Sequence, residues 1–195
     1  MKVSREQVAE NRKRILDAAS KLFREKGFDA IGVDAVMKAA GLTHGGFYGH
    51  FASKDDLVAQ ACAHALAHAD DSWTAATDPR AALASAYLDA DHCANPGDGC
   101  ALAALGPDIA RQRGDARRVF TEALETRVAD LASHLSGSRT ARRDQSVATW
   151  AGLVGAMVLA RGVDDPALSE EILKIGRSAF GGKPKRRAAA SRSRR

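Results

Sequence analysis

The chain has 195 residues, a formal net charge of +5, 45% hydrophobic residues and only 5% aromatic residues. Abundant Ala and Leu without strict apolar–polar alternation favour an all-α fold over one built on sheets. The N-terminal segment lacks the apolar core of a secretory signal, and the longest apolar run, Val147 to Ala160, is too short to span a bilayer. We therefore expect a cytoplasmic helical protein.

Positive charge gathers at the two ends of the chain. Residues 1–54 contain ten Lys or Arg against six Asp or Glu, and residues 183–195 contain seven basic residues and no acidic one. The segment between them, 55–182, contains 12 basic and 18 acidic residues. This asymmetry is typical of a nucleic-acid-binding end followed by a domain with another task, and it predicts a disordered basic tail over 183–195.

The first two helices are indicated by their caps. Ser4 and Gln7 predict a capping box for a helix that ends near Lys26. Gly32 then stands at the N-cap of a second helix, where glycine is weaker than Ser or Thr by a few tenths of a kcal/mol. Gly41 follows that helix, at the position where a left-handed residue commonly ends one.

A third, short helix of about seven residues carries groups suited to DNA contact. Phe47 and Phe51, four residues apart, are expected to anchor it to the core. Ser53 and Asp56 predict a capping box for the next helix, which begins near Lys54. Two helices joined by a glycine turn, the second with exposed polar groups, form the layout that places a helix in the major groove. The residues expected to contact DNA are Thr43, His44, Gly45, Gly46, Tyr48, His50 and Lys54.

Three glycines fall within this short helix: Gly45, Gly46 and Gly49. Each costs about 1 kcal/mol relative to Ala in a helix interior. Two interpretations stay open. Either the helix, held by its two phenylalanines, simply tolerates the glycines, or the missing side chains let its backbone approach DNA closely.

Six further helices are expected, and the whole chain then has about nine. They span roughly residues 54–75, 79–93, 100–111, 115–135, 140–161 and 166–180. The Asn-Pro-Gly-Asp-Gly run at 95–99 is the clearest loop. Gly106-Pro107 is expected to kink or split the helix in which it falls.

The helix expected at 140–161 is apolar on nearly every side, so that neighbours must cover both of its faces. Gly152, Gly155 and Ala156 would let another helix approach it closely. Together with the last helix it predicts a four-helix dimer interface, and the alternative is a core helix of a monomer. The residues assigned to the interface are Trp150, Leu153, Val154, Met157, Ile172, Ile175 and Phe180.

His64, His68 and Asp71 share one face of a predicted helix. Such a set can hold a metal, line a pocket or form part of a polar surface, and we favour a packing or surface role. No metal site and no cofactor is predicted.

Cys93 and Cys100 flank the loop at 95–99. With His92 adjacent to lower a thiol pKa, they could form a redox or electrophile switch, although inert buried cysteines are commoner.

The sequence indicates no enzyme. GxSxG, P-loop and HExxH motifs are all missing, and the one GxG, at residues 97–99, follows a predicted helix and lacks the third glycine of a dinucleotide-binding motif. No catalytic residue is therefore assigned.

Two stretches in roughly residues 10–60 resemble a known family. THGGFYGHFASKDDL and, upstream, RILDAASKLFREKGFDAIGVDAV are similar to the recognition helix and the first helices of TetR-family transcriptional repressors. The resemblance implies a homodimer in which residues 1–54 bind a palindromic operator in double-stranded DNA. It also implies that residues 55–182 form an effector-binding and dimerisation domain, from which a small molecule releases the operator.

An effector pocket in the larger domain would draw on its histidines, aromatic residues and other apolar side chains. The candidates are His64, His68, Trp73, Tyr87, Cys93, Leu102, Leu105, Phe120 and Trp150. Two other functions stay open: a repressor that senses oxidants or electrophiles through Cys93 and Cys100, and an architectural DNA-binding protein without an effector.

Overall fold

The structure is a computed structural model that describes residues 4–67 and 72–181. Every regular element in these ranges is helical, which confirms the all-α prediction. The predicted tail, His68 and Asp71 lie outside the described residues. The α-helices are α1 (Arg5–Lys26), α2 (Val33–Ala39), α3 (Lys54–Ala67), α4 (Pro79–Tyr87), α5 (Ala90–Ala94), α6 (Ala101–Arg111), α7 (Asp115–Ser133), α8 (Arg139–Gly162) and α9 (Pro166–Phe180), and the 3₁₀ helices are η1 (His44–Gly49) and η2 (Ser72–Ala75).

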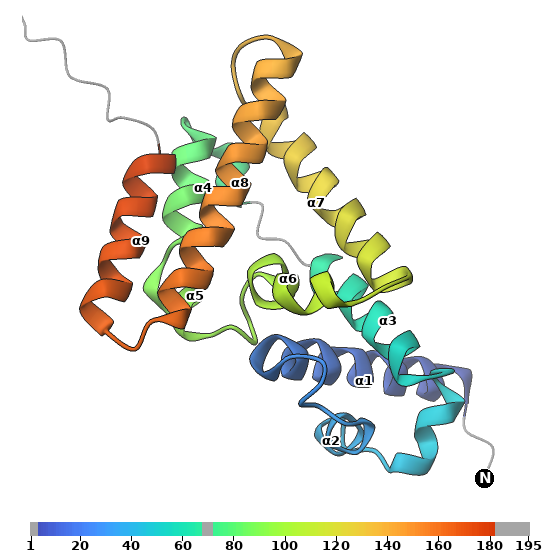
Figure 1. Cartoon of the computed structure of the whole chain (residues 1–195). Coiled ribbons are helices and arrows are strands. Elements are labelled where there is room, and N and C mark those ends of the chain that lie inside the picture. Colours follow the sequence, from blue (N-terminus) through green and yellow to red (C-terminus); the bar gives the residue numbers. More distant parts are fainter. Residues whose placement is uncertain (1–3, 68–71, 182–195) are drawn as a thin grey trace, which may run out of the picture.

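The helices form two groups that meet at α6 (Figure 1). α1, α2, η1 and the start of α3 make up one end of the molecule, and α4, α5, α8 and α9 make up the other. α7 packs along α3 and reaches α8, so it bridges the two groups. No helix of the described part is both long and apolar enough to cross a membrane.

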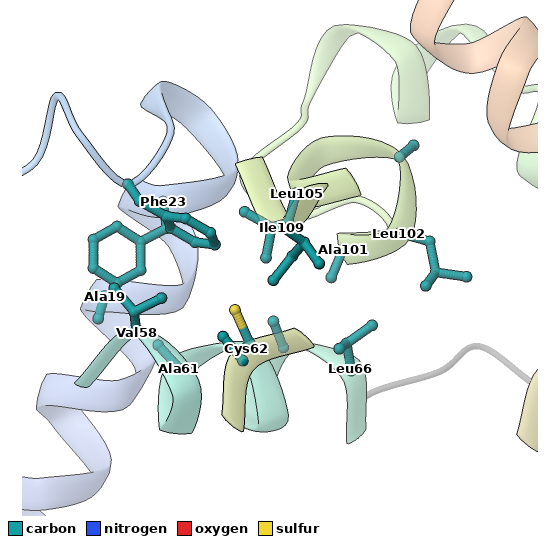
Figure 2. Close-up of a cluster of buried hydrophobic side chains, with 14 of the residues drawn as sticks. Ala19, Phe23, Val58, Ala61, Cys62, Leu66, Ala101, Leu102, Leu105 and Ile109 are labelled. Atoms are coloured by element: carbon teal, nitrogen blue, oxygen red, sulfur yellow. The ribbon is translucent and has the colours of Figure 1, made fainter. Parts of the chain in front are cut away.

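A buried cluster joins α6 to α1 and α3 (Figure 2). Leu102 and Leu105 of α6 are each only 1% exposed and lie among the side chains of this cluster, which include Phe23 and Cys62. Both leucines are predicted to line a pocket; their side chains fill the core between the two groups, and neither lines the two cavities described below. Burial raises the pKa of the Cys62 thiol to about 12, so this cysteine is inert packing.

Two helices are divided differently from the prediction. The helix expected at 79–93 is divided into α4 and α5, because the Asp89 carboxylate accepts the Asp91 N–H at 2.9 Å and caps a new helix. The helix with Pro107 is not split, since α6 runs without interruption from Ala101 to Arg111. A proline removes one backbone hydrogen bond, and the buried side chains on either side of it hold the helix in place.

Two of the three small residues of α8, Gly152 and Ala156, serve packing within the protomer, whereas a Cβ on Gly155 would meet nothing within 4 Å. A Cβ on Gly152 would overlap the ring of Phe180, and one on Gly176 of α9 would lie 3.3 Å from the Cβ of Ala156. The close helix approach predicted for this segment therefore occurs between α8 and α9 of one chain.

Three of the residues assigned to a dimer interface are unavailable for it. Trp150, Leu153 and Met157 are 3%, 0% and 0% exposed, because they face the protomer's own core. Ile175 is 58% exposed on α9, and Val154 and Ile172 are half-buried. Phe180 is also half-buried and packs on Gly152. Fewer of the residues assigned to the dimer interface therefore face outward than predicted.

Candidate functional site

The turn between α2 and η1 is set by one glycine. Gly41 has φ +69°, and the next N–H, that of Leu42, donates to the Met37 carbonyl at 2.9 Å, as in a Schellman turn. A Cβ on Gly41 would also lie 2.6 Å from the Arg14 guanidinium of α1. Glycine at this position therefore fixes the direction in which η1 leaves α2.

The element after the turn is a 3₁₀ helix rather than the expected α-helix. Its i→i+3 bonds include Gly46 N–H to the Thr43 carbonyl at 3.1 Å and His50 N–H to the Phe47 carbonyl at 2.9 Å. The 3₁₀ form is typical of short pieces, and three glycines weaken the α-helical alternative. Phe47 is 1% exposed and its ring stacks on Phe51 at 5.7 Å, which confirms the predicted anchor.

The fold itself does not require the glycines of η1. A Cβ on Gly45 or Gly49 would meet nothing within 4 Å, and one on Gly46 would be in ordinary contact with Met37 at 3.6 Å. None of the three has a positive φ. Gly45 and Gly49 therefore face open space, so both interpretations of the glycines, tolerance and close approach of a partner, stay open.

Tyr48 is the most exposed large side chain near the turn, with 72% of its surface accessible. Its ring packs edge-on against Phe47 at 5.1 Å, so its position is held although its hydroxyl is free to contact a partner. Thr43, at the N-cap of η1, is exposed and makes no side-chain capping bond. Both hydroxyls are thus available to a phosphate.

The start of α3, which follows η1 in the chain, supplies a cation. Ser53 Oγ accepts the Asp56 N–H at 3.0 Å, as predicted for a capping box. The Asp56 carboxylate accepts the N–H of Ala52 at 2.9 Å, one residue before the Ser53 N–H that a capping box uses. Hydrogen bonds that its carboxylate accepts from the Gln60 amide and from the Ala52 N–H lower the pKa of Asp56. Lys54, the first residue of α3, has no ion-pair partner among residues 4–67 and 72–181.

Neither histidine of this segment is both exposed and unpaired. His44 is 54% exposed, and its Nδ1 pairs with the Asp34 carboxylate of α2. His50 is half-buried; its carbonyl accepts the Arg12 Nη1–H at 2.9 Å, and its own Nδ1 is buried with no partner in the described ranges. His50 therefore joins η1 to α1 and is less open to DNA than predicted.

A cavity of about 390 Å³ lies away from η1, lined by Arg24 of α1 and by residues of the helices that follow α3. It brings together Trp73, Tyr87 and Trp150, three of the residues predicted for a pocket. No local sequence pattern signals its charged lining, because those residues come from distant elements. The lining that was not predicted includes Arg24, His92, Asn95, Cys100 and Arg127.

The remaining predicted pocket residues lie elsewhere. His64 Nε2 contacts the Asp17 carboxylate of α1 at 2.6 Å, which ties α3 to α1. Cys93 lines a second, more open cavity of about 570 Å³ beside α9, and Phe120 is half-buried next to Gly106.

His92 is committed to the backbone. Its Nδ1–H donates to the Tyr87 carbonyl at 2.6 Å, and its Nε2 accepts the Cys100 N–H at 2.8 Å. The second bond requires a neutral imidazole, and burial lowers the pKa of His92 accordingly. Backbone groups thus engage both ring nitrogens of His92, and neither Cys93 nor Cys100 forms a disulfide.

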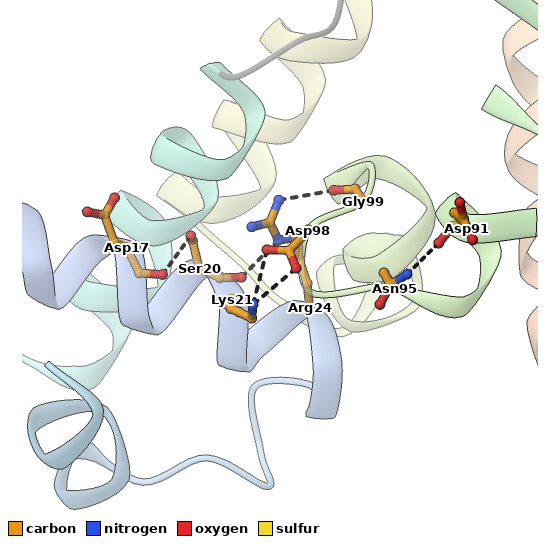
Figure 3. A network of polar contacts seen from close by, with 8 residues as sticks. All are labelled: Asp17, Ser20, Lys21, Arg24, Asp91, Asn95, Asp98 and Gly99. Carbon is orange, nitrogen blue, oxygen red and sulfur yellow. Dashed lines mark hydrogen bonds and ion pairs between the residues drawn. The ribbon is translucent and has the colours of Figure 1, made fainter. Parts of the chain in front are cut away.

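The loop at 95–100 attaches the cavity to α1 (Figure 3). Lys21 Nζ binds the Asp98 carboxylate at 3.0 Å, and Arg24 Nη1 donates to the Gly99 carbonyl at 3.0 Å. The same loop lines the cavity. One short segment thus contacts both the cavity and the first helix of the N-terminal group.

Sequence comparison places the N-terminal part in a known family. Residues 15–61 match the family model of bacterial regulatory proteins, tetR family. The HTH-type transcriptional regulator AcrR of Shigella flexneri is 37% identical over 57 residues, which cover 29% of this chain and 26% of that protein. An HTH-type transcriptional repressor of Mycobacterium tuberculosis is 35% identical over 88 residues, or 45% of this chain and 44% of that protein. The chain thus matches less than half the length of these relatives.

Solved structures extend the likeness of fold to the larger domain. A TetR-family transcriptional regulator of Cytophaga hutchinsonii superposes with a TM-score of 0.73 at 19% identity, covering 92% of this chain and 96% of that one. Reduced NemR of Escherichia coli does so with a TM-score of 0.71 at 19% identity, covering 87% and 94%. Residues 15–61 thus match the helix-turn-helix segment of the tetR family, and the fold of the chain is that of solved TetR-family transcriptional regulators.

Proposed function

We propose that the protein is a homodimeric repressor that binds a palindromic operator and is released from it by a small molecule in the 390 Å³ cavity. The observation that carries this proposal is the loop at 95–100, which lines the cavity and is bonded to α1 through Lys21 and Arg24. A ligand that displaces this loop acts directly on α1.

α1 in turn holds both parts of the helix-turn-helix. Arg12 donates to the carbonyl at the end of η1, on His50, and Arg14 donates to the Ala40 carbonyl at the end of α2. A movement of α1 is thereby passed to α2 and η1 together. In a dimer such a movement changes the separation of the two η1 elements, which must match half-sites roughly 34–36 Å apart.

DNA contact is proposed for the exposed face of η1 and the start of α3. Two hydroxyls and a cation are available for phosphates, from Tyr48, Thr43 and Lys54. The half-buried His50 would add at most a contact with the DNA backbone. His44 and the Gly45-Gly46 backbone lie where base edges would be. So few side chains imply that DNA shape and half-site spacing contribute much of the specificity.

The dimer is proposed from two exposed apolar stripes on neighbouring helices. On α8 the stripe has helical spacing and is made of Val147, Ala151, Val154 and Val158. On α9 it is made of Leu168, Ile172, Ile175 and Ala179. A second copy that covers both stripes would complete a four-helix interface.

The test starts from binding-site selection with random duplexes, followed by footprinting and light scattering. A two-fold symmetric footprint bound by a dimer supports the proposal. A monomer at micromolar concentration, or a footprint with no preferred sequence, contradicts it and favours an architectural DNA-binding protein. The effector response is then measured as loss of operator binding in a screen of small molecules.

A further inference from the structure

We infer that the 390 Å³ cavity takes a small aromatic carboxylate. This inference rests on the proposed effector function and names the chemical class of the effector. It begins with three of the five buried side-chain polar atoms that have no hydrogen-bond partner in residues 4–67 and 72–181: Arg127 Nε, Arg161 Nη1 and the Tyr87 hydroxyl, which has the weakly hydrogen-bonding Cys100 thiol nearby. Tyr87 and Arg127 line the cavity, and the Arg161 guanidinium lies beside Gly99 of its loop.

All three unpartnered atoms can donate a hydrogen bond, and two of them belong to cations. A buried donor without an acceptor costs about 1–3 kcal/mol, and more for a charged group. The group that would satisfy them is therefore an acceptor with negative charge. A carboxylate has two such oxygens and matches the planar guanidinium.

The walls around these donors are aromatic and fixed. Tyr87 meets Trp150 edge-on with ring centroids 5.7 Å apart, and the Arg127 guanidinium lies 5.8 Å from the Trp150 ring centroid. Trp150 Nε1–H also donates to the Arg127 carbonyl at 3.0 Å, which holds α8 against α7. Trp73 adds a third ring to the lining. Such walls favour a flat ring over a flexible chain.

Acidic groups do not cancel the positive interior. Asp98 is 70% exposed and bound to Lys21, and Asp91 is exposed at the rim. Arg24, half-buried with its Nη1 on the Gly99 carbonyl, is the second arginine of the lining beside Arg127. A cationic ligand would have to sit among these arginines. The volume of about 390 Å³ suits a ligand of one or two rings.

The chain contains its own reporter for the test. Its only two tryptophans, Trp73 and Trp150, both line the cavity, so intrinsic fluorescence follows occupancy there. The full-length protein is titrated with benzoate and 2-naphthoate and with the neutral amides benzamide and 2-naphthamide, with calorimetry as a second readout. We expect saturable binding of at least one acid, and at least tenfold weaker binding of its amide.

Three variants connect that preference to the named groups. Arg127→Gln should weaken acid binding at least tenfold and leave amide binding unchanged, and Arg127→Lys should restore part of it. Tyr87→Phe removes only the unpartnered hydroxyl and should weaken acid binding severalfold. Arg118→Gln, an exposed arginine on the same helix, is the control and should change nothing. Thermal melting by circular dichroism checks that each variant is folded.

Equal affinity for acid and amide, no acid binding at millimolar concentration, or unchanged acid binding by both Arg127→Gln and Tyr87→Phe would overturn the inference. Its failure is separable from that of the proposed function. Acids that bind without releasing the operator support the inference and contradict the proposed effector response. Release of the operator by neutral compounds alone supports the effector response and contradicts the inference.

Discussion

The Arg24 guanidinium of α1 donates a 3.0 Å hydrogen bond to the Gly99 carbonyl, which lies 75 residues further along the chain. This bond and the neighbouring pair of Lys21 with Asp98 join the N-terminal group of helices to a loop that lines the cavity. They supply the short physical path that the proposed effector response requires.

The Lys21–Asp98 pair provides a test of that path. Asp98→Asn should change the free energy of unfolding by less than about 1 kcal/mol, because the pair is exposed. Ligand-induced operator release should be weakened by up to about fivefold, since the coupling lost is of the same size. Release is measured by fluorescence anisotropy of labelled operator. Lys13→Ala, which breaks an exposed pair on α1 that does not touch the loop, is the control. Equal release by Asp98→Asn and the wild type would exclude a role for the pair.

The glycines of η1 should separate folding from DNA binding. Gly45→Ala and Gly49→Ala should leave stability unchanged or raise it by up to about 1 kcal/mol, because their side chains enter open space. Both should weaken operator binding if the backbone approaches DNA there. Gly41→Ala should instead destabilise the fold by about 1–2 kcal/mol, because of its φ of +69°. Urea unfolding and operator titration distinguish the two classes, and unimpaired operator binding by both η1 variants would favour simple tolerance of glycine.

Lys54 should act through phosphate charge. Lys54→Ala should weaken binding to all DNA sequences and reduce the slope of log K against log salt by about one unit. Tyr48→Phe should weaken binding without changing that slope, since it removes only a hydroxyl. Titrations at several salt concentrations measure both effects. Lys174→Ala, which removes an exposed lysine of α9, is the control for loss of a positive charge. An unchanged slope for Lys54→Ala would place this lysine outside the DNA contact.

The neutral state of His92 predicts a pH dependence of stability. Because burial lowers its pKa from 6.5, the folded protein binds fewer protons than the unfolded chain as the pH falls below that value. The stability contributed by His92 is therefore complete above pH 6.5 and is lost as the pH falls toward its folded pKa. Chemical unfolding of the wild type and of His92→Gln between pH 7.5 and about 5 measures the difference. Parallel curves for the two proteins would contradict this assignment.

The apolar stripes should control oligomeric state. Ile175→Arg or Val158→Arg should yield folded monomers with at least tenfold weaker operator binding, because one half-site is then engaged at a time. Lys174→Glu, about 100° round the helix from Ile175, should remain dimeric. Light scattering at micromolar concentration decides the outcome, and a dimer for both arginine variants would move the interface elsewhere.

Local features could be predicted from the sequence. Ser4 caps α1 by accepting the Gln7 N–H at 3.1 Å, although the Gln7 side chain turns to Asn11 instead of completing the box. The glycine turn after α2 and the Phe47–Phe51 anchor are likewise present as expected. These interactions join residues a few positions apart, so residue type and spacing are sufficient to specify them.

The sequence by itself thus determined the helical class, the caps, the turn and the exposed segment that follows it. Only the tertiary structure decided which apolar side of α8 faces inward, because a helix that is apolar all round has no periodic signal to orient it. It also decided that Arg24, Arg127 and Trp150 meet around one cavity. Contacts between residues so far apart depend on how whole helices pack, and no local spacing encodes that packing.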